Sequence, residues 1–90
     1  MALVEADHFA DQVCVRVYIA GRLAEAKRVE QTLSDAGADY FVDIERFERR
    51  LLGLIRREYD GVAFYVPAER AAVIRELLRR ADLTTGLEET

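Results

Sequence analysis

The sequence is poor in the residue types that most often build metal and disulfide sites. Its 90 residues include one cysteine, Cys14, one histidine, His8, and no tryptophan. One cysteine cannot form a disulfide within the chain, and a structural zinc site normally takes four cysteine or histidine ligands. We therefore expect no disulfide and no zinc site. We interpret Cys14 as a half-buried strand residue, because no general base is recognisable beside it.

The chain also has no excess of positively charged residues. The 13 Lys and Arg are outnumbered by 17 Asp and Glu, which gives a formal net charge of −4. Sequence-independent binding of nucleic acid needs the opposite balance. No apolar run approaches the roughly 18 residues of a membrane span, and residues 1–7 lack the basic and apolar regions of a signal peptide. The sequence predicts a cytoplasmic protein with neither a nucleic-acid nor a membrane partner.

Chain breakers are scarce, since there are one proline and five glycines. Apolar residues make up 51% of the chain and charged residues 33%, which is a globular composition. Ninety residues suffice for one modest core. We expect residues 1–12 to form a flexible N-terminal segment and residues 13–90 to form a single domain.

Two stretches alternate with period two and then change to helical spacing. Residues 13–19 predict a strand, with Val13, Val15, Val17 and Ile19 on one face. A helical pattern follows at Leu23, Ala26, Val29, Leu33 and Ala36, and Gly37 stands where a left-handed C-cap belongs.

The second stretch repeats this order. Residues 62–66 predict a strand, and Pro67 and Glu69 suit the first turn of a helix. The apolar positions of that helix are Val73, Ile74, Leu77, Leu78 and Ala81. Further strands are predicted over residues 38–45 and, at a sheet edge, over residues 83–87. The whole pattern favours an α+β fold, a ferredoxin-like βαββαβ sandwich whose antiparallel sheet carries two helices on one face.

Residues 46–60 are ambiguous between a hairpin and a short helix. Ile44, Phe47 and Leu51 fit a helical period, whereas Gly53 and the sheet argument favour a long hairpin crossing. The apolar residues Leu51, Leu54 and Ile55 predict a contact, either with the sheet or with another chain. Five arginines lie in this segment among acidic residues, which is typical of a solvated stretch.

The order of elements, with Ala36-Gly37, Tyr40-Phe41-Val42 and Gly61 to Glu69, resembles small bacterial proteins described as putative signal transducers and grouped with the PII-like nitrogen regulators. The resemblance implies a ferredoxin-like core, a trimer, a loop between the second and third strands that contacts partners, and nucleotide bound between subunits. The PII proteins hold phosphate with a glycine-rich basic segment after the third strand. Here that position holds Pro67 to Arg70, without glycine and with a carboxylate, so nucleotide binding is not expected.

Aromatic residues are predicted to gather on the sheet face away from the helices. Alternation places Tyr18, Phe41 and Tyr65 there, and Phe47 is a further candidate. Such a face can bind a second protein surface. Stacking of RNA bases is the rival, but the basic and glycine-rich signature of RNA-binding sheets is absent. The candidate interaction surface is Tyr18, Phe41, Phe47, Leu51, Leu54, Ile55 and Tyr65.

No catalytic constellation is recognisable, so an enzyme is the least supported class and no cofactor is expected. The sequence favours a small regulatory or interaction module that forms homo-oligomers or binds a protein partner, and that resembles PII-like signal transducers without their nucleotide site. The alternative is a small-molecule sensor, with a ligand in a cleft between subunits lined by Tyr18, Phe41 and Tyr65.

Overall fold

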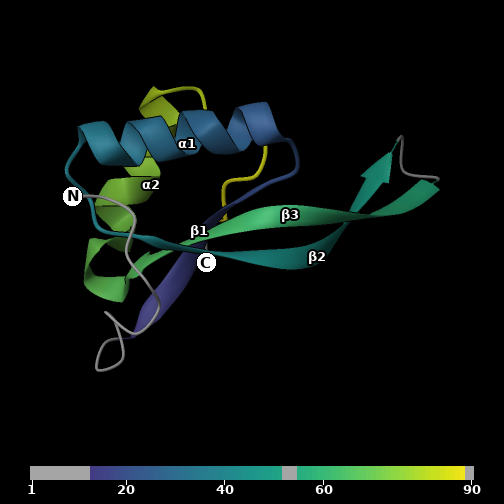
Figure 1. The fold of residues 1–90 in the computed structure, drawn as a ribbon, viewed down its shortest axis with the longest axis horizontal. Helices are drawn as coiled ribbons and strands as arrows, with labels where there is room; N and C mark the ends of the chain where they lie inside the picture. The colour runs from purple at the N-terminus through teal and green to yellow at the C-terminus, as the bar shows by residue number, and fades with distance from the viewer. Residues whose placement is uncertain (1–12, 52–54, 89–90) are drawn as a thin grey trace.

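The computed structural model describes residues 13–51 and 55–88, and for residues 47–51 and 55–59 it describes only the backbone. The elements follow in the order β1 (Cys14–Ala20), α1 (Leu23–Asp35), β2 (Phe41–Leu51), β3 (Ile55–Pro67), a 3₁₀ turn η2 (Ala68–Arg70) and α2 (Ala71–Arg80). The strands form one antiparallel sheet in the order β1-β3-β2. Both helices lie on one face of it (Figure 1). The prediction of an α+β fold with an antiparallel sheet and two helices is confirmed.

A β-bulge in β1 changes which of its residues face the helices. Arg16 pairs with Tyr65, but Tyr18 already pairs with Phe64, so Val17 is the extra residue. A bulge shifts the alternation of all residues beyond it. Tyr18 therefore takes a core position with 0% exposure, and Ile19, opposite Ala63, falls outside the core cluster. The prediction that Ile19 faces the helices and Tyr18 faces away is wrong.

The core lies between the sheet and the two helices. Tyr40 and Phe64 are both fully buried there, with ring centroids 5.7 Å apart. Helix α1 contributes Ala26, Val29 and Leu33, as its spacing predicts. Helix α2 contributes Ala71, Ile74 and Leu78. Val73, which the sequence placed on the buried face of this helix, is instead 64% exposed.

Both helices end in the same C-terminal motif. Gly37 has φ 69°, its N–H donates to Ser34 O, and the Ala38 N–H donates to Leu33 O, which is the Schellman pattern. The left-handed cap predicted at Gly37 is thus confirmed. At the end of α2 the equivalent left-handed position is Asp82, with φ 60°, and the Leu83 N–H donates to Leu78 O.

The C-terminal segment docks against the outer edge of β1. Leu87 forms an isolated antiparallel bridge with Tyr18, flanked by hydrogen bonds from Ile19 N to Gly86 O and from Glu88 N to Val17 O, each 2.9 Å. The strand predicted over residues 83–87 is thus reduced to one bridge. Gly86 permits this approach, because a Cβ there would lie 1.9 Å from Ile19 O.

Residues 46–51 and 55–60 belong to the two strands of a long hairpin rather than to a helix or an open loop. The register of β2 and β3 is continuous from Phe41 opposite Tyr65 to Leu51 opposite Ile55. Figure 1 shows that the outer half of this hairpin projects past both helices. The connection 52–54, which contains Leu54, and the N-terminal segment 1–12 lie outside the described residues.

Candidate functional site

The most distinctive group of side chains lies on the sheet face opposite the helices. Phe41 of β2 and Tyr65 of β3 are Cα partners, and their rings stack with centroids 4.9 Å apart and planes 4° from parallel. Their chain neighbours Tyr40 and Phe64 point into the core, so the pair stands on the helix-free face. Both rings are half-buried. The prediction that Phe41 and Tyr65 share this face is confirmed.

A polar network extends from this aromatic pair. The Tyr65 hydroxyl donates to Glu45 Oε2, and the Arg16 guanidinium donates through Nη1 to Glu45 Oε1. Arg16 also lies against the C-terminal segment, with Nη2 3.1 Å from Glu88 Oε2 and Nε 2.5 Å from Glu88 Oε1. We call Arg16, Phe41, Glu45, Tyr65 and Glu88 the sheet-face cluster. It joins all three strands and the C-terminal segment.

Small residues make room for this network. Glu45 lies opposite Gly61, and the next position of the same face pairs Asp43 with Ala63. Gly61 and Ala63 are both buried. Because neither residue carries a large side chain, the Tyr65 hydroxyl can reach the carboxylate of Glu45, which lies four residues beyond Phe41 on β2.

The cluster keeps Tyr65 protonated and Arg16 charged at neutral pH. Burial, together with the hydrogen bond to Glu45, raises the pKa of Tyr65 to about 12. Hydrogen bonding to Glu88, and then to Glu45, raises the pKa of Arg16 above its usual value. Tyr65 is therefore a neutral donor and Arg16 a cation between two carboxylates. The local charge is net negative, which does not suit an anionic ligand.

The predicted surface is only partly assembled. Tyr18 lies on the helix side, where its hydroxyl donates to Glu25 Oε2 at 2.5 Å, so it does not share a face with Phe41 and Tyr65. Phe47, Leu51 and Ile55 are placed in the strands by their backbone, but their side chains lie outside the described atoms. Leu54 lies in the undescribed connection.

The sequence reasoning missed the charged members of the cluster. Arg16, Glu45 and Glu88 are far apart in the chain, and no motif links them. Alternation did place Arg16 with the outward residues of its strand and Glu45 with Phe41. The C-terminal segment brings Glu88 to Arg16 by docking against β1. Neither hydrophobic periodicity nor residue spacing in the sequence indicates this contact.

The described side chains that could serve as a nucleophile or as metal ligands are few and dispersed. Cys14 is half-buried in β1, as expected, and burial raises the pKa of its thiol, which disfavours the reactive thiolate. Within residues 13–51 and 55–88, no three His, Cys, Asp or Glu side chains group closely enough to hold a metal ion.

The segment that would correspond to the PII phosphate site is arranged differently. Pro67 leads into the three-residue turn η2, with Glu69 exposed in its first turn. The backbone N–H of Ala68 donates to Val13 O at 2.9 Å. That donor is therefore already used within the fold, and Glu69 would repel an approaching phosphate.

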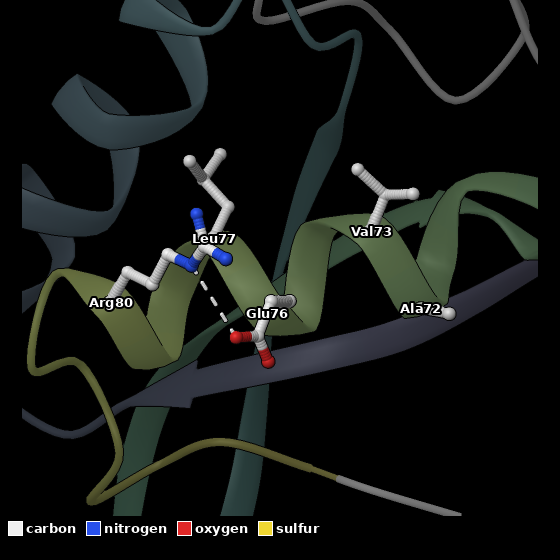
Figure 2. A pocket seen from close by; sticks show the side chains of 5 residues that line it. All are labelled: Ala72, Val73, Glu76, Leu77 and Arg80. Atoms are coloured by element: carbon white, nitrogen blue, oxygen red, sulfur yellow. Dashed lines mark hydrogen bonds and ion pairs between the residues drawn. The ribbon is translucent and has the colours of Figure 1, made fainter.

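A second surface feature is an apolar hollow of about 430 Å³ along α2. Figure 2 shows Val73 and Leu77 standing on one side of the helix, with Glu76 and Arg80 beside them. Arg80 Nε lies 3.4 Å from Glu76 Oε1. The hollow is shallow and lined mainly by aliphatic atoms, so it offers little by which a polar ligand would be selected.

The two α-helices of the described chain are too short and too polar to span a bilayer. Comparison of the chain with protein-family models, with curated proteins and with solved structures finds no match.

Proposed function

We propose that this chain is a small non-catalytic interaction module of ferredoxin-like topology that associates with copies of itself through its sheet. The order of elements supports this topology, since the C-terminal segment beside β1 occupies the place of a fourth strand. The proposal includes a regulatory role like that of PII-like signal transducers, without nucleotide binding, because the segment at η2 has no glycine, carries the exposed Glu69, and already uses the Ala68 N–H within the fold.

One observation supports self-association above the others: β2 presents apolar side chains on both faces of the sheet. Phe41 lies on the helix-free face, while Val42 and Ile44 lie on the other face and are 37% and 67% exposed. An edge strand with apolar residues on both faces favours a covered state, because burial of each apolar side chain contributes roughly 1.5–3 kcal/mol.

The test is the mass in solution, measured by light scattering on the wild type, Ile44→Lys and Val73→Lys. The two aliphatic residues are almost equally exposed, at 67% and 64%, but lie on β2 and α2 respectively. We expect the wild type and Val73→Lys to have a multiple of 10.3 kDa and Ile44→Lys to shift toward 10.3 kDa. A monomeric wild type at millimolar concentration would overturn the proposal.

A further inference from the structure

Strand β2 forms the longest edge of the described sheet. It pairs with β3 on one side along eleven residues, whereas the opposite edge of the sheet, at β1, is bridged by Leu87. An edge presents a row of backbone N–H and C=O groups that a further strand can pair with. The question is which strand fits this edge.

The register of the hairpin places residues of like charge opposite each other. Three successive cross-strand pairs carry one sign each: Glu48 and Glu58, Arg49 and Arg57, Arg50 and Arg56. Like charges directly opposite each other are destabilising in an antiparallel pair. Closer to the helices, the pair of Arg46 and Asp60 has opposite charges, with Arg46 Nε 3.4 Å from Asp60 Oδ1. A neighbouring strand with opposite charges would therefore stabilise the outer half of the hairpin.

The sequence of β2 supplies such charges to itself. When two copies of β2 run antiparallel with Phe47 opposite Phe47, Arg46 meets the second copy's Glu48 and Glu45 meets the second copy's Arg49. The two-fold axis repeats both pairs, so four opposite-charge pairs flank one aromatic pair. Cross-strand pairs of opposite charge and of aromatic residues both stabilise a sheet.

Neighbouring registers lose this match. A pairing centred on Arg46 keeps only the opposite-charge pair of Asp43 with Arg49 and sets Arg46 against itself. A pairing centred on Glu48 sets Glu48 against itself and Arg46 against Arg50. The two intermediate registers offset an opposite-charge pair with a like-charge pair: Asp43 with Arg50 but Glu45 with Glu48, or Glu45 with Arg50 but Arg46 with Arg49. Only the register centred on Phe47 forms four opposite-charge pairs and no like-charge pair.

The shape of the fold leaves room for this pairing. Both helices cover the inner part of the sheet, and the hairpin projects past them (Figure 1). A two-fold axis at Phe47, in the middle of β2, sets the projecting half of each hairpin beside the inner half of the other. The helices of the two copies are then displaced from each other along the strands.

We infer that two copies of this chain pair edge to edge along β2, antiparallel and centred on Phe47, to form one continuous six-stranded sheet. This inference rests on the proposed self-association and names its surface and register.

The first test exchanges the charges of one pair. Arg46→Glu and Glu48→Arg each place like charges in both symmetry-related pairs, so each variant is expected to dimerise roughly tenfold more weakly than the wild type. Mixed in equal amounts, the two variants regain opposite charges and are expected to form a heterodimer, visible by native mass spectrometry. Glu30→Arg, at an exposed position of α1, is the matched control and is expected to dimerise like the wild type.

The outcomes separate the two proposals. A monomeric wild type would overturn the proposed function and this inference together. A wild-type oligomer that both single variants retain unchanged would leave the proposed function standing and overturn the β2 pairing. Weakened single variants that do not recover on mixing would likewise overturn it.

The second test fixes the register by cross-linking in a Cys14→Ser background. Phe47→Cys lies opposite its own copy, and we expect oxidation to produce a disulfide-linked dimer. Leu51→Cys is the control, because its own copy lies eight residues away along the strands, roughly 25 Å. Cross-linking of Leu51→Cys in preference to Phe47→Cys would overturn the register.

Discussion

The Tyr65 ring stacks on Phe41 while its hydroxyl donates to Glu45, so one side chain of β3 contacts β2 in two places. The stack holds the two strands in register where the hairpin begins. The hydrogen bond does so again four residues further along β2. The pair thus links the core of the domain to the edge strand through which we propose that it associates.

This arrangement predicts a dependence of stability on alkaline pH. The pKa of Tyr65 is raised from 10.0 to about 12 in the folded protein, so the folded state binds the proton more tightly than the unfolded state. Its contribution is complete below pH 10 and is lost as the pH rises toward 12. Urea denaturation of the wild type and Tyr65→Phe should therefore show a stability difference at pH 8 that narrows by pH 11.5. An equal difference at both values would contradict this assignment.

Arg16 is expected to hold the C-terminal segment and β2 to β1. In Arg16→Met the carboxylates of Glu45 and Glu88 remain close together, half-buried and without their cation. We expect a loss of roughly 1–2 kcal/mol in the free energy of unfolding, because the ion pairs are partly screened by solvent. Arg22→Met, at an exposed position, should change it by less than roughly 0.5 kcal/mol. Equal effects of the two variants, measured by urea denaturation, would argue against the cluster.

Gly86 is expected to tolerate no side chain. Because a Cβ would lie 1.9 Å from Ile19 O and 2.8 Å from Tyr18 Cε1, Gly86→Ala must push the C-terminal segment away from β1. Overpacking of this kind typically costs about 1–3 kcal/mol. The amides of Ile19 and Glu88, which donate across this contact, should also lose protection from hydrogen exchange. Wild-type stability and protection in Gly86→Ala would show that the segment does not dock as described.

Asp82 offers a stabilising change. It holds φ 60° at the end of α2, a conformation that glycine adopts without a steric penalty. Asp82→Gly should raise the free energy of unfolding by up to roughly 1 kcal/mol. The greater flexibility of glycine in the unfolded chain offsets part of this gain. The reverse comparison at the end of α1, Gly37→Asp, should lower it. A melting temperature that falls in Asp82→Gly would contradict this account of the cap.

The amphipathic patterns predicted the elements well, because burial of one face imposes a period that the residues themselves carry. Alternation in residues 40–45 separated Tyr40 from Phe41 correctly, and the spacing of Ala26, Val29 and Leu33 located the buried side of α1. Gly37 identified the end of that helix, since a left-handed residue is needed there.

The errors arose where tertiary pairing decides. Residues 13–19 alternate without interruption, so nothing in them reveals the bulge at Val17 that turns Tyr18 into the core. The sequence does not distinguish a hairpin from a short helix over residues 46–60, because Phe47 and Leu51 also fit a helical period. Pairing with residues 55–60 decides in favour of strand. Glu88 joined the sheet-face cluster only through the docked C-terminal segment, which depends on contacts distant in sequence.

The most direct measurement of the central claim is hydrogen exchange of the backbone amides of residues 41–51 at increasing protein concentration. Pairing between two copies predicts that those β2 amides that do not donate to β3 become protected as the concentration rises, while protection elsewhere in the sheet stays constant. Exchange of these amides that remains fast and independent of concentration, in a protein that is nonetheless oligomeric, would contradict β2 as the contact between copies.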